Sequence, residues 1–148
     1  MVLVDVNLLI HAVNVDFPDH LRAKIWLEGL LQRQETVGLP WAVLVAFVRI
    51  TTNPRAMARP FTLDEAPQLA HEWLRLPSVV VLHPASGHET RFAALCRAAS
   101  AAGNLVTDAH LAALAMEHNC EMASNDTDFA RFPGLRWFNP LDTPQPRP

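Results

Sequence analysis

Several residue types that build common nucleotide and metal sites are scarce in this chain of 148 residues. It has five glycines, and they form neither a dinucleotide-binding fingerprint nor a P-loop. Its seven histidines form no HxxxH or HExxH motif and no Cys/His cluster, which argues against a zinc site. The single lysine, Lys24, lies in an early predicted helix, whereas a receiver-like phospho-acceptor domain needs a lysine late in its sheet. None of these sites is therefore expected.

Cysteines and long apolar runs are also few. The two cysteines, Cys96 and Cys120, both lie among apolar residues, and we interpret them as reduced, buried thiols of a cytosolic protein. No segment approaches the length of a membrane span. The first residues contain no basic region, and Asp5 interrupts their apolar run, so they do not resemble a signal peptide. We expect a cytoplasmic protein with no membrane partner.

Positive charge is limited as well. The formal net charge is −3, which argues against a protein that holds nucleic acid by bulk electrostatic attraction. Contact with RNA would then depend on a local patch or on a bound metal ion. Half of the residues are hydrophobic, so a chain of this length can bury a sizeable core. We expect one domain over residues 1–141 and a disordered, proline-rich tail at 142–148.

Short apolar runs that fit strands alternate with longer segments of helical spacing. The predicted strands span residues 2–6, 37–39, 79–82, 120–124 and 135–138. The predicted helices span residues 8–12, 19–34, 41–53, 63–76, 86–102 and 107–119. Capping boxes at Thr62–Glu65 and Ser86–Glu89 mark two helix starts, and Gly103 is expected to end the fifth helix. This alternation predicts an α/β fold with a mainly parallel sheet of four or five strands.

Three aspartates lie at predicted strand exits or helix entrances. Asp5 ends the first strand, Asp126 follows the strand at 120–124, and Asp108 lies in the first predicted turn of the helix at 107–119. Because the carboxyl ends of parallel strands share one edge of a sheet, we expect these acids to converge there. Such acids repel one another unless a cation lies between them. The pattern predicts a Mg²⁺ or Mn²⁺ site that can act on a phosphodiester, although each aspartate taken alone also fits a helix cap or a solvated turn.

Other polar residues lie close to these acids in the sequence. Asp128 is a further candidate for the site, or a cap for the short helical turn that follows it. Asn7, Thr107 and Asn125 are candidates to orient ligands or waters, with backbone capping as the alternative for each. Arg49 is a weak candidate for RNA contact, and solvated surface charge is its alternative role.

Three segments of the chain are MVLVDVNLLIHA, LPWAVLVAFVRITTNP and GNLVTDAHLAALAMEHNCEMASNDTDFARFPGLRWFNPL. Together they resemble PIN-domain proteins, and in particular the VapC-type toxins of VapBC toxin–antitoxin modules. The resemblance implies a PIN-like three-layer sandwich and a Mg²⁺- or Mn²⁺-dependent endoribonuclease that inhibits translation. It also implies neutralisation by a VapB-type antitoxin and a homodimer. The acids of the family match Asp5, Asp108 and Asp126, with Asp128 as an accessory match.

One position departs from the family pattern. Where the family has a glutamate before Phe-x-Arg, this chain has Ala46, and residues 36–63 contain no aspartate or glutamate that could replace it. Weaker metal binding or a single-metal site follows as a hypothesis. The alternative function is a catalytically degenerate PIN module that acts only by binding its antitoxin or the operator complex.

Overall fold

A five-stranded sheet forms the centre of the computed structural model, which describes residues 1–142. Its strands are β1 (Val2–Val4), β2 (Val37–Gly38), β3 (Val79–Val80), β4 (Glu121–Ala123) and β5 (Trp137–Phe138). They lie in the order β3-β2-β1-β4-β5, and every neighbouring pair is parallel. The predicted parallel α/β fold is confirmed. Apart from residue 142, the predicted proline-rich tail lies outside the described residues.

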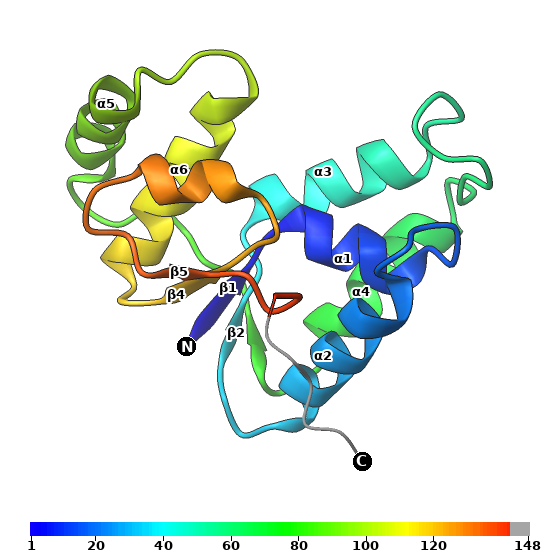
Figure 1. Cartoon of the computed structure of the whole chain (residues 1–148). Coiled ribbons are helices and arrows are strands. Elements are labelled where there is room, and N and C mark those ends of the chain that lie inside the picture. The colour runs from blue at the N-terminus through cyan, green and yellow to red at the C-terminus, as the bar shows by residue number, and fades with distance from the viewer. Residues whose placement is uncertain (143–148) are drawn as a thin grey trace.

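Helices cover both faces of this sheet, as the predicted three-layer sandwich requires. They are α1 (Val6–Val13), α2 (His20–Gln32), α3 (Trp41–Thr51), α4 (Glu65–Leu74), α5 (His88–Ala99), α6 (Asn104–Glu117) and the 3₁₀ helix η1 (Thr127–Arg131). Figure 1 shows α1 to α4 on one side of the sheet and α5 and α6 on the other. The chain thus covers one face before β3 and crosses to the other face between β3 and β4.

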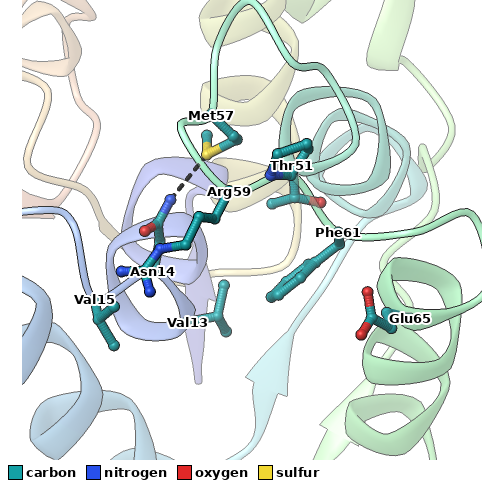
Figure 2. Close-up of a pocket in the computed structure, with 9 residues that line it drawn as sticks. Val13, Asn14, Val15, Thr51, Met57, Arg59, Phe61 and Glu65 are labelled. Atoms are coloured by element: carbon teal, nitrogen blue, oxygen red, sulfur yellow. Dashed lines mark hydrogen bonds between the residues drawn. The ribbon is translucent and has the colours of Figure 1, made fainter.

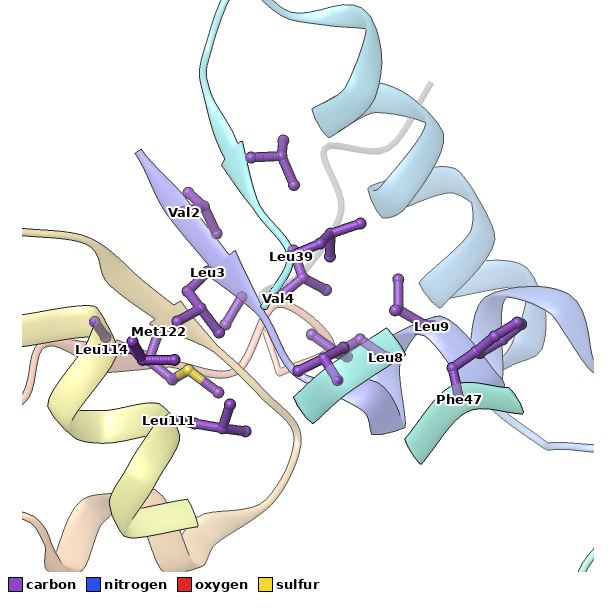
Figure 3. Close-up of a cluster of buried hydrophobic side chains, with 14 of the residues drawn as sticks. Val2, Leu3, Val4, Leu8, Leu9, Leu39, Phe47, Leu111, Leu114 and Met122 are labelled. Carbon is purple, nitrogen blue, oxygen red and sulfur yellow. The ribbon is translucent and has the colours of Figure 1, made fainter. Parts of the chain in front are cut away.

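The core surrounds β1, whose three residues are each at most 3% exposed. A strand with helices on both faces must be apolar at successive positions, which explains the uninterrupted run Val2–Val4. Figure 3 shows Leu3 on the same side as Leu111 and Leu114 of α6, while Leu39 and Leu9 lie toward the helices of the other face. The position of the core therefore follows from the central place of β1 in the sheet.

Polar contacts join α5 to α6. His88 Nδ1 of α5 lies 2.9 and 3.0 Å from the two carboxylate oxygens of Glu117 at the end of α6. The other ring nitrogen of His88 lies 2.9 Å from Nδ1 of His110. The side chain of Glu117 is only 4% exposed, and its carboxylate also accepts from the backbone N–H of Ala85. These contacts fix α5 on α6, the helix that carries Asp108.

The ends of two elements differ from the sequence predictions. The fifth helix ends at Ala99 because Ser100 takes the left-handed conformation, so Gly103 does not end it. Gly103 instead has a φ of 58° and stands just before α6, which begins at residue 104 and not at 107. Asp108 consequently lies in the second turn of α6, and the predicted place in the first turn was wrong. Both loop residues have positive φ, which periodicity does not reveal.

Of the two capping boxes, one forms. The Thr62 hydroxyl accepts from the backbone N–H of Glu65, whose carboxylate accepts from the N–H of Thr62 at 2.8 Å. At the start of α5, Gly87 occupies the cap position with a φ of 87°, and no side chain caps the helix, so the box predicted at Ser86–Glu89 was wrong.

The first strand is also shorter than predicted, because Asp5 already caps α1. Both cysteines are free thiols. Cys120 is buried as predicted, whereas Cys96 is only half-buried, so the predicted burial of Cys96 was wrong. Within residues 1–142, no helix is long and apolar enough to cross a membrane.

Candidate functional site

Asp5 stands between the end of β1 and the start of α1, where it is 3% exposed. One carboxylate oxygen accepts the backbone N–H of Val6 at 2.7 Å and caps α1. The other accepts the hydroxyl proton of Ser124 at 2.6 Å. Burial raises the pKa of Asp5 from 3.8 to about 6, against the lowering effect of these hydrogen bonds. The position of this carboxylate is therefore well defined, and its negative charge is poorly solvated.

Asp108 reaches the same site from α6. Burial, followed by the negative charges of Asp5, Asp126 and Asp128 in that order, raises its pKa from 3.8 to about 7. Such an effect requires Asp5, Asp126 and Asp128 to lie within electrostatic range of Asp108. The structure thus brings Asp5 toward acids that lie more than 100 positions away in the sequence.

Asp126 follows β4 and is half-buried. Its backbone N–H donates to the Ser124 hydroxyl at 3.0 Å, and its carboxylate accepts the N–H of Asp128 at 2.9 Å as the cap of η1. Ser124 is fully buried and contacts both acids, so it holds Asp5 and Asp126 in one arrangement. Ser124 was not predicted from the sequence as a site residue. Its position directly after the buried strand β4 and two residues before Asp126 could have indicated this role.

The strand order explains why the acids meet at this point. The chain moves from β1 through β2 to β3 in one direction along the sheet, and β4 then pairs with the opposite side of β1. The crevice beyond the carboxyl ends of β1 and β4 is therefore a topological switch point, the usual ligand position in open parallel sheets. Asp5 follows β1, and Ser124 and Asp126 follow β4.

Asp128 lies at the margin of this cluster. It is exposed, and its carboxylate is 3.4 Å from Nη1 of Arg131. Its charge still raises the pKa of Asp108, but by less than burial, Asp5 or Asp126. Asp126 caps η1, so the capping role considered for Asp128 belongs to its neighbour.

The other predicted residues differ in how close they lie to the acids. Asn125 directly precedes Asp126, and its Oδ1 is a buried atom without a hydrogen-bond partner among the described residues. Asn7 is half-buried in the first turn of α1, next to the Asp5 cap. Thr107 is exposed on α6, beside Asp108 in the sequence.

Arg49 lies at a groove whose lining includes none of the four aspartates. It lines this apolar groove of about 480 Å³ between α3 and α4, together with the exposed side chains of Trp41 and Val45. A second pocket, of about 270 Å³, lies beyond the end of α1. Figure 2 shows Arg59 near Asn14 in this pocket, and no residue of the acidic cluster lines it.

The acidic cluster fits a hydrated divalent cation better than a fully protein-ligated one. Within residues 1–142, no group of three or more His, Cys, Asp or Glu side chains is arranged to hold a metal ion. Mg²⁺, however, usually takes one or two carboxylates and keeps several waters. The pKa values of Asp5 and Asp108 are raised mainly by burial and further by neighbouring negative charge, and a bound cation would stabilise the deprotonated carboxylates. The oxygen-only donor set suits a hard cation.

Comparison with known proteins agrees with this architecture. The PIN domain family model matches residues 2–135. "Ribonuclease VapC37" of Mycobacterium tuberculosis is 40% identical over 140 residues, which cover 95% of this chain and 97% of that protein. "Ribonuclease VapC33" of the same species is 38% identical over 141 residues, or 95% of this chain and 99% of that protein.

Solved structures share the fold at lower identity. VapBC2 from Rickettsia felis, bound to a promoter DNA fragment, superposes with a TM-score of 0.67 at 18% identity and covers 94% of this chain and 98% of that chain. Mycobacterium tuberculosis VapC20, described as a Sarcin-Ricin loop cleaving toxin, has a TM-score of 0.64 at 20% identity and covers 92% of this chain and 99% of that chain. The family match over residues 2–135, together with these relatives, shows that the chain belongs to the PIN-domain family and groups with its VapC members.

Proposed function

We propose that the protein is the toxin of a type II toxin–antitoxin pair, a divalent-metal-dependent endoribonuclease that cleaves RNA and inhibits translation. The observation that carries the proposal is the convergence of Asp5, Asp108 and Asp126 at the switch point of a PIN-domain sheet. Full-length relatives at about 40% identity that are named ribonucleases support the same activity.

In this proposal, Asp5 and Asp108 hold a Mg²⁺ or Mn²⁺ ion, and Asp126 completes the acidic wall of the site. The ion, when bound, polarises the phosphodiester and lowers the pKa of a bound water. Ser124 keeps Asp5 and Asp126 in place through hydrogen bonds at 2.6 and 3.0 Å. Asn125 Oδ1 is a buried acceptor without a hydrogen-bond partner among the described residues, and it is available to a water or ligand.

The protonation of the acids couples metal binding to pH. Since the pKa values of Asp5 and Asp108 are raised to about 6 and 7, the metal-free site holds protons near neutral pH. Metal binding must displace them, so the apparent affinity falls as the pH is lowered through this range.

The partners follow from the toxin role. A VapB-type antitoxin is the proposed inhibitor, and it would insert an apolar helix into a groove and direct a basic side chain toward the acids. RNA is the proposed substrate, and the cytoplasm is the proposed location because RNA and antitoxin meet there. A homodimer is proposed from the family resemblance.

A catalytically degenerate module was the alternative, because Ala46 replaces the usual glutamate. Residues 36–63, which include all of α3, contain no acid, so α3 adds no carboxylate to the site. Three acids at the sheet edge and the similarity to named ribonucleases favour catalysis over the degenerate module.

The test is RNA cleavage by the purified protein with Mg²⁺, with Mn²⁺ or with EDTA, and with Asp5→Asn as the control. Metal-dependent cleavage that Asp5→Asn abolishes would support the proposal. Growth arrest on expression, compared between the wild type and Asp5→Asn, extends the test to RNA targets that are absent from the assay. Growth arrest that Asp5→Asn leaves intact would favour the degenerate module.

A further inference from the structure

The hydrogen-bond ladder between β4 and β5 stops at a proline. The N–H of Met122 donates to the carbonyl of Arg136, and the N–H of Ser124 donates to the carbonyl of Phe138. In a parallel ladder, the carbonyl of Ser124 would next accept the N–H of residue 140. That residue is Pro140, which has no N–H. The backbone alone thus leaves the Ser124 carbonyl without its ladder partner.

A side chain replaces the missing donor. The indole Nε1–H of Trp137, in β5, donates to the Ser124 carbonyl at 3.1 Å. Ser124 has no exposed surface, so bulk water cannot donate a hydrogen bond to its carbonyl. A buried carbonyl of this kind needs a partner within the protein. The indole therefore completes the sheet at the point where β4 ends.

Ser124 links the Trp137 contact to the acids. Ser124 is held by its N–H and its carbonyl to β5, and its hydroxyl contacts the Asp5 carboxylate and the Asp126 N–H. Loss of the carbonyl contact releases one end of the residue that aligns both acids. A shift of the hydroxyl by a few tenths of an ångström would weaken a hydrogen bond of 2.6 Å between Ser124 and Asp5.

We propose that Trp137 is a positioning residue for the acidic site, because its indole N–H replaces the ladder donor that Pro140 lacks and so fixes Ser124. The proposal rests on the metal site of the proposed function for its effect on metal binding. The hydrogen-bond relay itself is independent of any metal.

The central experiment compares Trp137→Phe with the double variant Trp137→Phe/Pro140→Ala. The first keeps an aromatic ring but removes the N–H, and the second returns a main-chain N–H at position 140. Trp26→Phe is the matched control, because the Trp26 ring packs on Phe138 of the same strand at a centroid distance of 6.5 Å. Mn²⁺ affinity by calorimetry is the first readout. Amide hydrogen exchange of Asp126, whose N–H donates to the Ser124 hydroxyl, is the second.

We expect Trp137→Phe to weaken Mn²⁺ binding by about tenfold, as is typical for groups that orient metal ligands. Exchange of the Asp126 amide should become about tenfold faster. The Pro140→Ala change should restore both toward the wild type, and Trp26→Phe should alter neither. Restoration separates a lost hydrogen bond from a lost packing contact.

Two results would overturn the relay: unchanged Asp126 exchange in Trp137→Phe, or a loss that Pro140→Ala does not recover. If the wild-type protein binds no Mn²⁺, the proposed metal site fails, and the exchange measurement still decides the relay. If exchange responds as expected but Mn²⁺ affinity does not, Trp137 holds Ser124 without positioning the acids, which contradicts the proposal.

Discussion

The hydroxyl of Ser124 donates to the carboxylate of Asp5 at 2.6 Å, across 119 positions of sequence. The contact joins the ends of β1 and β4, the two strands on either side of the switch point. Both side chains are at most 3% exposed. The acid that caps the first helix is therefore oriented by a residue from the other half of the sheet, and this geometry underlies the predictions below.

The first prediction concerns Ser124 itself. Ser124→Ala leaves a buried Asp5 oxygen and the Asp126 N–H without their partner, which should cost about 1–3 kcal/mol of stability. Because the Ser124 hydrogen bond lowers the pKa of Asp5, its loss should also raise that pKa. Thermal unfolding and calorimetric Mn²⁺ titration measure the two effects. Ser124→Thr keeps the hydroxyl and is the control. Equal Mn²⁺ affinity in Ser124→Ala and the wild type would contradict the assigned role.

The second prediction concerns stability and pH in the absence of metal. Asp5 and Asp108 have pKa values raised from 3.8 to about 6 and 7, so the folded state binds more protons than the unfolded state between about pH 4 and 7. Stability contributed by their protonated forms is therefore lost as the pH rises through about 4 to 7. We expect Asp5→Asn to raise the Tm of the metal-free protein at pH 8 more than at pH 5, measured with EDTA present. An equal change in Tm at both values would argue against a poorly solvated Asp5.

As a further part of the second prediction, added metal should reverse the loss of stability at high pH. Mn²⁺ binds the deprotonated acids, so its stabilising effect should be larger at pH 8 than at pH 5.5. Thermal unfolding with and without Mn²⁺ at the two pH values measures the difference, and Asp108→Asn should reduce it. A shift in Tm that is the same at both pH values would mean that the ion binds elsewhere.

The third prediction separates the central acids from the marginal one. Asp108→Asn should reduce RNA cleavage by about 100-fold or more, since a metal ion supplies several kcal/mol to such reactions. Asp128→Asn should reduce it only several-fold, because Asp128 is exposed and pairs with Arg131 at 3.4 Å. Initial rates on one RNA substrate at saturating Mg²⁺ give the comparison. Equal losses in the two variants would place Asp128 among the metal-holding residues.

The fourth prediction concerns the missing acid of α3. Ala46→Glu should tighten Mn²⁺ binding, because it supplies the carboxylate that the family resemblance implies at this position. Val45→Glu is the control for added charge, since Val45 is 59% exposed and lines the apolar groove between α3 and α4. Calorimetry of the two variants measures the effect. Unchanged affinity in Ala46→Glu would show that residue 46 does not reach the ion.

Local patterns in the sequence determined the elements and the identity of the acids. The alternation of apolar runs with helical spacing predicted the parallel sheet, because periodicity depends on residues a few positions apart. The position of Asp5 and Asp126 after buried strands predicted that they share one edge, since parallel strands end together. The capping box at Thr62–Glu65 formed for the same local reason.

Tertiary structure decided which groups contact one another and how strongly. The start of α6 depends on the positive φ of Gly103, so the turn that holds Asp108 did not follow from helical spacing. The hydrogen bond from Ser124 to Asp5 and the indole contact that replaces the donor missing at Pro140 both depend on the order of strands in the sheet. The raised pKa values of Asp5 and Asp108 arise from burial and from neighbouring charges, which exist only once the chain has folded. Local preference thus determined the elements and the acids, whereas long-range packing determined their geometry, because burial and through-space contacts are properties of the assembled sheet.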